Sequence, residues 1–182
     1  MMIYVFLAQG FEEIEAISVV DVLRRASCEV KTVAVGSDNF VVGANKIKVV
    51  ADLKKEDMNL SKVSGVVLPG GMPGAVNLLN SAAALNAIRY CHENKKLIAA
   101  ICAAPMILGK LNLLEGKKAT CYPGFEKELL NSKVSDERVC TDGNIITAKG
   151  PGVAVEFALK IVEYVVGKNE ADVVKSSMLC KD

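Results

Sequence analysis

Residues 97–108 read LIAAICAAPMIL, and this stretch decides both the fold and the candidate site. Five apolar residues typical of a buried strand lead into Cys102, and small residues followed by Pro105 then open a helix. Small-x-Cys-x-small is the pattern of a nucleophile elbow, a sharp strand-to-helix turn that presents a reactive side chain. The positive end of the helix dipole favours a thiolate there, so Cys102 is the predicted nucleophile. The alternative is an inert cysteine buried at a strand end.

The composition limits the classes of protein to which this chain can belong. It has 182 residues, a net charge of +1 and 51% hydrophobic residues. This length predicts a single domain over residues 1–182, with strands buried on both faces. The charge pattern predicts no nucleic-acid partner, and no apolar run is long enough to cross a membrane. Residues 1–8 lack the charged start of a signal peptide, and the six cysteines fit free thiols, so a cytoplasmic protein is expected.

Apolar runs typical of strands alternate with helical patterns along the chain. The predicted strands lie at 3–7, 30–35, 66–68, 97–101, 119–121 and 145–147, with a hairpin at 40–50. The predicted helices lie at 12–26, 75–93 and 153–166, with a short one near 171–175 and Gly167 as a C-cap. This alternation predicts parallel β-α-β units and a three-layer α/β/α sandwich around a mostly parallel sheet.

Ligands of such folds bind beyond the carboxyl ends of the strands, where residues 8–12, residues 69–74 and Cys102 should converge. The Gly70-Gly71 pair offers backbone N–H groups that no side chain obstructs. Together with the N–H group of Ala103, it predicts an oxyanion hole, although Gly-Gly can also be a simple tight turn. Gly150 and Pro151 open a late helix in the same way and are, with Gly70, candidate pocket-lining residues, although for the later pair a structural turn is the simpler interpretation.

The candidate acid/base partner of Cys102 is a carboxyl group. The single histidine, His92, lies near the end of the helix that precedes the 97–101 strand, so it should sit at the opposite edge of the sheet. Glu15 instead shares a helical stripe with apolar residues near the site, where desolvation should raise its pKa. A first-turn glutamate stabilised by the helix dipole is the alternative. No metal-ligand spacing is present, so no metal is expected.

Together, these stretches resemble the DJ-1/PfpI (ThiJ) superfamily, and most closely its DJ-1 subfamily. The likeness spans nearly the whole chain; the matching stretches are 7–15, 67–71, 98–105, 149–152, 157–162 and the terminal Lys181-Asp182. The resemblance implies a flavodoxin-like sandwich, a homodimer and no cofactor. It implies that Cys102 is the oxidisable nucleophile, that Glu15 is a protonated acid bonded to its sulfur, and that Gly71 and Ala103 supply backbone donors.

The chain departs from family patterns in two places that bear on its chemistry. Tyr122 stands where animal members carry a histidine, which leaves Glu15 as the titratable partner and makes Tyr122 a pocket-lining residue. Asn45 and Lys46 stand in the stretch where family members often place an arginine. The protease branch needs a histidine at the position of Ala103, and glutamine amidotransferases need a late histidine, so both activities are disfavoured.

Three functions follow as hypotheses. The first is a cofactor-independent glyoxalase III or deglycase enzyme, in which Cys102 adds to a small 2-oxoaldehyde such as methylglyoxal, or acts on a glycated substrate, and Glu15 moves the proton. The second is a redox-sensing stress-response protein in which Cys102 is oxidised to a sulfinic acid. The third, a chaperone, has no specific support in the sequence.

Overall fold

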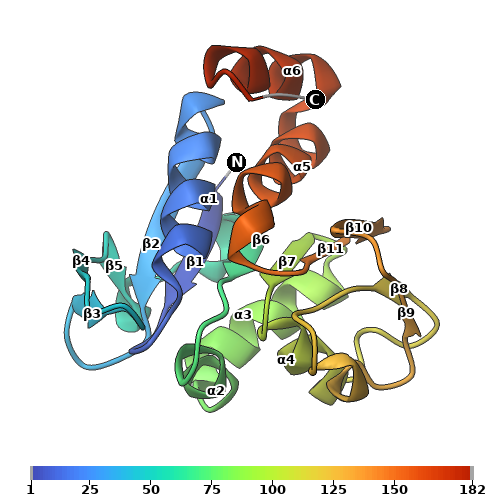
Figure 1. Ribbon diagram of the computed structural model, residues 1–182. Coiled ribbons are helices and arrows are strands. Elements are labelled where there is room, and N and C mark those ends of the chain that lie inside the picture. Colours follow the sequence, from blue (N-terminus) through green and yellow to red (C-terminus); the bar gives the residue numbers. More distant parts are fainter. Residues whose placement is uncertain (1, 181–182) are drawn as a thin grey trace.

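The computed structural model describes residues 2–180, so the terminal Lys181-Asp182 match lies outside the described residues. A seven-stranded sheet in the order β10-β11-β7-β6-β1-β2-β5 forms the middle layer (Figure 1). All of its neighbouring strands are parallel except β10 and β11. Its strands are β1 (Met2–Leu7), β2 (Glu29–Ala34), β5 (Leu53–Lys54), β6 (Val63–Leu68), β7 (Leu97–Ile101), β10 (Val139–Asp142) and β11 (Ile145–Ala148).

Helices cover both faces of this sheet. One face packs against α1 (Glu13–Arg25) and α5 (Ala154–Val166), and α6 (Lys168–Ser177) packs on α5 (Figure 1). The other packs against α2 (Gly74–Leu79), α3 (Ala82–Glu93) and α4 (Pro105–Lys110). In β1, Ile3 and Val5 face the first group while Tyr4 and Phe6 face the second, because successive strand residues point to opposite faces. The predicted three-layer sandwich is confirmed.

Two small sheets lie outside the main one. The predicted hairpin is present as antiparallel β3 (Phe40–Val42) and β4 (Lys48–Val50), beside the start of α1 (Figure 1). The strand expected at 119–121 is instead the short β8 (Lys118–Ala119), which pairs with β9 (Lys133–Val134) and not with the main sheet. Short 3-10 turns occur at Lys55–Asp57, Leu60–Lys62, Glu126–Glu128 and Pro151–Val153.

The prediction of one continuous helix over 75–93 is wrong. The chain breaks after α2, and the Ser81 side chain accepts a hydrogen bond from Ala84 N at 3.4 Å to cap a new helix, α3. The last helix is longer than the expected 171–175, whereas Gly167, at φ +98°, ends α5 as predicted. Within residues 2–180, each helix is too short or too polar to cross a membrane.

Candidate active site

Cys102 occupies the sharp turn that the sequence predicts. Its φ is +65°, a left-handed conformation uncommon for a residue with a side chain. Two bonds hold this turn: Cys102 N donates to Ala148 O of β11, and Tyr122 N donates to Cys102 O, each at 2.9 Å. Because α4 begins at Pro105, β7, the turn and the helix form the expected elbow. The side chain is nearly buried, with the residue 9% exposed.

Glycine is required where the β6 loop meets the elbow. A β-carbon on Gly70 would lie 2.6 Å from Cys102 Cβ and 2.9 Å from Glu15 Oε2, so a side chain there would displace the site. Gly71 has a φ of +82°, and a β-carbon on it would lie 2.5 Å from Glu12 N. Gly70 therefore lets the loop approach the thiol closely, and Gly71 lets it approach the backbone of residues 10–12.

Glu15 points from the first turn of α1 toward this loop and is fully buried. Its Oε2 accepts a hydrogen bond from Gly70 N at 2.8 Å. Its Oε1 is the one buried side-chain oxygen or nitrogen within residues 2–180 that lacks a hydrogen-bond partner. The pKa of Glu15 is raised to about 7, mainly by burial and also by the charge of Glu12, although the bond from Gly70 and the contact with Cys102 act to lower it.

The thiol and the carboxyl group form a coupled pair. Burial and the negative charge of Glu15 together raise the pKa of Cys102 to about 12, although the backbone N–H groups of Gly71 and Ala103 act to lower it. Burial and the neighbouring carboxylate therefore act against the thiolate that the sequence predicts at the start of α4. A thiolate becomes accessible when the single proton of the pair resides on Glu15.

The other predicted residues lie at the rim of the site or away from it. The Tyr122 ring packs on Gly150, where an added β-carbon would be 3.0 Å from Cδ2, and the residue is 46% exposed. Pro151 lines a groove of about 650 Å³ along α5 and α6, and Cys102 does not belong to that lining. His92 is exposed in the last turn of α3, the helix that leads into the opposite end of β7.

Sequence reasoning missed two groups that position the site. Glu12 is the N-cap of α1, and its Oε2 accepts a hydrogen bond from Glu15 N at 2.8 Å, which fixes the turn that carries the acid. Ala148 O holds the elbow, but it could not be anticipated because a carbonyl contact leaves no signature in side-chain types. Among residues 2–180, no three His, Cys, Asp or Glu side chains gather as a metal site would require.

The arrangement combines a nucleophile, an acid that can give or take one proton, and backbone donors. Gly71 and Ala103 lie where an oxyanion formed next to the sulfur would need N–H groups. Such a set can support addition of the thiolate to a carbonyl carbon, with Glu15 as general acid and base.

Comparisons with known proteins agree with this geometry. The DJ-1/PfpI family pattern matches residues 1–164. Protein dj-1beta of Drosophila melanogaster is 39% identical over 177 residues, covering 96% of this chain and 95% of that protein. Protein DJ-1 homolog B of Arabidopsis thaliana is 39% identical over 92% of this chain, although the chain spans only 39% of that protein's length.

A solved structure shows the same fold. Oxidized DJ-1 of Toxoplasma gondii superposes with a TM-score of 0.94 at 36% identity, covering 98% of this chain and 97% of the other. The match therefore extends over the sheet, both helical layers and the elbow. The chain belongs to the DJ-1/PfpI family and is a DJ-1-like protein.

Proposed function

We propose that this protein is a cofactor-independent enzyme that uses Cys102 to convert small 2-oxoaldehydes, such as methylglyoxal, to 2-hydroxy acids. One observation carries the proposal: the buried Glu15 has an oxygen without a hydrogen-bond partner within the described chain, and it interacts with the Cys102 thiol. A carboxyl group with a pKa of about 7 can both donate and accept a proton near neutral pH.

The reaction begins with the pair carrying one proton, held by Glu15. The Cys102 sulfur adds to the aldehyde carbon, and the carbonyl oxygen takes the proton to give a hemithioacetal, with the N–H groups of Gly71 and Ala103 stabilising the developing charge. The Glu15 carboxylate then removes the proton from that carbon and delivers it to the adjacent carbon. The hydroxyl proton of the first carbon passes to the oxygen of the adjacent carbon, which leaves a thioester of the 2-hydroxy acid. Water hydrolyses the thioester to the 2-hydroxy acid and frees the sulfur. The sum is addition of one water to one 2-oxoaldehyde.

The test is lactate formation from methylglyoxal by the purified protein, compared with Cys102→Ala and Glu15→Gln. We expect lactate from the wild type, none from Cys102→Ala, and a loss of about 100-fold or more for Glu15→Gln, the usual contribution of a general acid/base. Full activity in Glu15→Gln would remove the carboxyl group from the mechanism. Thermal unfolding of all three proteins serves as the folding control.

A second role, in sensing oxidants, is favoured by the same backbone donors. Oxidation of Cys102 to a sulfinate creates a negative charge on its oxygens. The N–H groups of Gly71 and Ala103 can stabilise this charge, and a protonated Glu15 can donate a hydrogen bond to it. Of the relatives, the Toxoplasma gondii DJ-1 structure is described as oxidized. The two roles are compatible, because both use the Cys102 thiol and the Glu15 carboxyl group.

We also propose that the protein forms a homodimer through α1 and the hairpin. Four large apolar side chains are 41–67% exposed there: Ile14, Ile17, Ile47 and Val50. Ile17 and Val50 line one shared groove of about 300 Å³, so the two elements present one surface. Clustered exposed apolar side chains of this kind mark association surfaces, and a second copy brings a matching one.

Light scattering during size-exclusion chromatography tests the homodimer. We expect wild type at twice the monomer mass and Ile17→Asp at the monomer mass. Val173, which is 61% exposed on α6, provides the control substitution Val173→Asp, and this variant should remain dimeric. A monomeric wild type at micromolar concentration would overturn the proposal.

A further inference from the structure

Glu13, two residues before Glu15, is a second buried acid on α1, and the proposed chemistry does not use it. It is 5% exposed, and three hydrogen bonds from the β3–β4 turn reach its carboxylate. Oε1 accepts from Asn45 N at 2.8 Å and from Ile47 N at 3.3 Å, and Oε2 accepts from Asn45 Nδ2 at 3.0 Å. The burial of Glu13 raises its pKa, but these bonds outweigh it, and the net pKa is lowered. Glu13 is therefore an ionised clamp.

The hairpin turn is shaped around this carboxylate. A β-carbon on Gly43 would lie 2.2 Å from Glu13 Oε1 and 2.3 Å from its Cδ, so the turn packs directly on the acid. Lys46 has a φ of +70°, which lets the flanking N–H groups of Asn45 and Ile47 point to one oxygen. The turn thus binds Glu13 with backbone groups as well as with one side chain.

The segment before Glu13 lies between the hairpin and the glycine loop of the site. On one side, Gly10 N donates to Val42 O and Ala44 N donates to Phe11 O, each at 2.8 Å. On the other side, Glu12 N donates to Gly70 O at 3.0 Å. A displacement of the hairpin turn would therefore move residues 10–12, which support the Gly70 loop.

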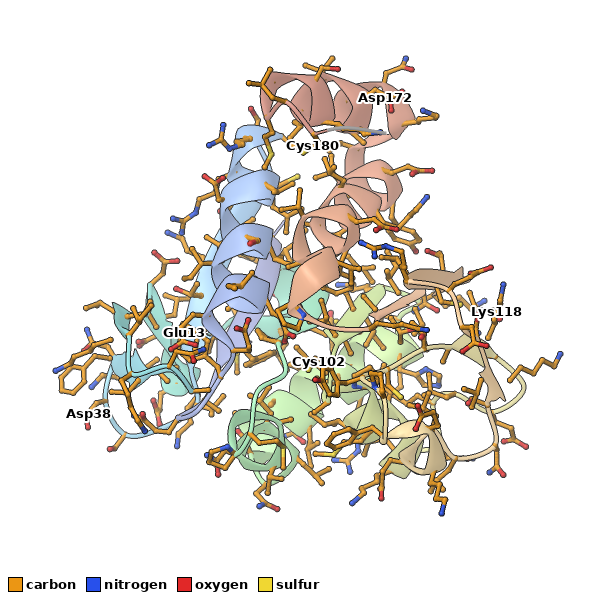
Figure 2. The ribbon with its side chains drawn as sticks, viewed as in Figure 1. Glu13, Asp38, Cys102, Lys118, Asp172 and Cys180 are labelled. Carbon is orange, nitrogen blue, oxygen red and sulfur yellow. The ribbon has the colours of Figure 1, made fainter. Side chains whose placement is uncertain are left out.

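Glu13 and Glu15 leave the same helical turn in nearly opposite directions, because residues two apart on an α-helix are about 200° apart around its axis. Figure 2 shows Glu13 between the start of α1 and the hairpin, with Cys102 on the other side of that helix end. Glu15 in turn is bonded to Gly70 N. The first turn of α1 is thus held from both sides by its own carboxyl groups.

We propose that Glu13 is a positioning residue: by binding the turn at Asn45, it fixes the first turn of α1 so that Glu15 stays directed at Cys102. The inference rests on the proposed pairing of Glu15 with the thiol, and it adds the hairpin as the element that sets this pairing. Glu13 itself does not touch the sulfur or the substrate.

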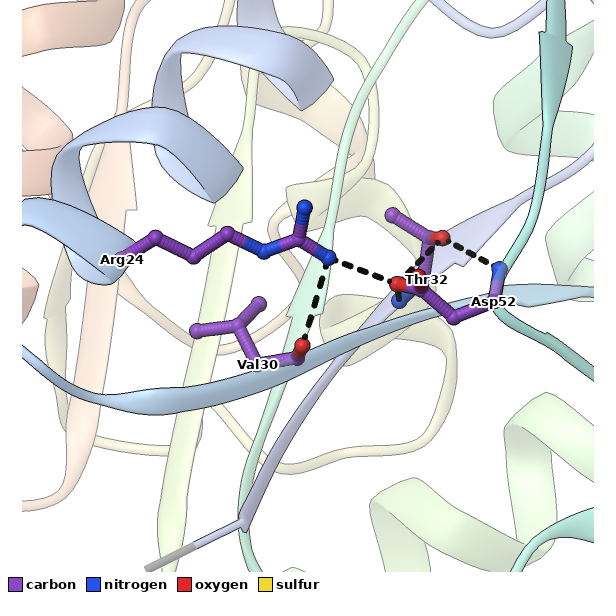
Figure 3. A network of polar contacts seen from close by, with 4 residues as sticks. All are labelled: Arg24, Val30, Thr32 and Asp52. Atoms are coloured by element: carbon purple, nitrogen blue, oxygen red, sulfur yellow. Dashed lines mark hydrogen bonds and ion pairs between the residues drawn. The ribbon is translucent and has the colours of Figure 1, made fainter.

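A second carboxylate clamp on the same hairpin supplies a matched control. Asp52, just after β4, accepts hydrogen bonds from Thr32 N at 2.8 Å and Thr32 Oγ1 at 2.9 Å, and it pairs with Arg24 at 2.8 Å (Figure 3). This clamp joins the far end of the hairpin to β2 and to the last turns of α1. Thr32→Val should loosen the hairpin without touching the first turn of the helix.

The experiment measures the alkylation rate of Cys102 by iodoacetamide between about pH 5 and pH 9, with the labelled peptide quantified by mass spectrometry. Wild type should show an inflection near pH 7 from Glu15, and Glu15→Gln should lack it. We expect Glu13→Ala and, more weakly, Asn45→Ala to lose or displace the inflection. Glu13→Gln can still accept from the turn and should restore it, and Thr32→Val should keep it.

Each outcome decides between the two proposals. If Glu15→Gln changes the profile while Glu13→Ala does not, the positioning inference fails and the thiol–carboxyl pair stands. An unchanged profile in Glu15→Gln would overturn the pair and the positioning inference together. Loss of the inflection in Thr32→Val as well would show general loosening and would also refute a specific role for Glu13. If Glu13→Ala does not fold, Asn45→Ala, which keeps the acid and both backbone donors, decides the same question.

Discussion

Gly70 and Cys102 approach so closely that a β-carbon on the glycine would lie 2.6 Å from the β-carbon of the cysteine. Real side chains do not pack at this distance, so the β6 loop and the elbow fit only if position 70 has no side chain. The contact fixes where the loop N–H groups lie relative to the sulfur.

Gly70→Ala should therefore damage both stability and reactivity. We expect a loss of about 1–3 kcal/mol in the free energy of unfolding, typical of overpacking, together with slower alkylation of Cys102. Chemical denaturation and mass spectrometry measure the two effects. Gly36→Ala is the matched control, because a β-carbon there meets nothing within 4 Å. Equal effects of the two substitutions would contradict the steric argument.

The raised pKa of Glu15 predicts how stability depends on pH. Its value moves from 4.5 to about 7 on folding, so the folded protein holds this proton more tightly than the unfolded chain. The resulting stabilisation is complete below the unfolded pKa and is lost as the pH rises through the folded pKa. Since one pKa unit corresponds to about 1.4 kcal/mol, the change between pH 4.5 and pH 7 is on the order of 3 kcal/mol at most.

Urea denaturation at a series of pH values tests this dependence. Wild type should lose stability across that window, and Glu15→Gln should show a flatter profile because the amide does not titrate. Burial raises the pKa of Glu13, but the bonds from Asn45 and Ile47 outweigh it, and the net pKa is lowered from 4.5. Its effect on stability therefore has the opposite sign to that of Glu15, and stability is lost only as the pH falls below 4.5. A wild-type profile parallel to that of Glu15→Gln would rule out the coupled titration.

Mild peroxide should add two oxygens to Cys102 before any other cysteine. Two equivalents of peroxide convert the thiolate to a sulfinate and release two waters. Burial raises the pKa of Cys91, Cys121 and Cys140 as it raises that of Cys102, so the expected preference rests on the N–H groups of Gly71 and Ala103, which can stabilise a sulfinate at Cys102. Peptide mapping locates the added mass. Oxidation distributed over all six cysteines would count against a dedicated redox site.

Tyr122→Phe tests whether the phenol acts as an acid at the rim of the site. The Tyr122 ring packs on Gly150 at a surface position, and the predicted acid is Glu15. We therefore expect alkylation and any turnover to change by about twofold or less, the range of surface substitutions. A loss comparable to that of Glu15→Gln would make the hydroxyl group a catalytic acid.

Local patterns predicted the fold well because the strands are buried and the helices alternate with them. The elbow followed from the small residues around Cys102, and the burial of Glu15 followed from its apolar stripe. The break at Ser81 was missed because apolar periodicity continues across the cap. The Glu13 clamp was also missed, since its partners are mostly backbone N–H groups of a distant turn, which side-chain identity does not encode.

The left-handed backbone of Cys102 has an evolutionary consequence. At φ +65° a residue with a β-carbon is strained by about 1–2 kcal/mol, and glycine is not. Glycine at this position would relieve the backbone strain, so the thiol takes up a part of the stability of the fold in exchange for reactivity. If selection on the thiol were relaxed in a descendant of this chain, Cys102→Gly should be among the first substitutions to spread.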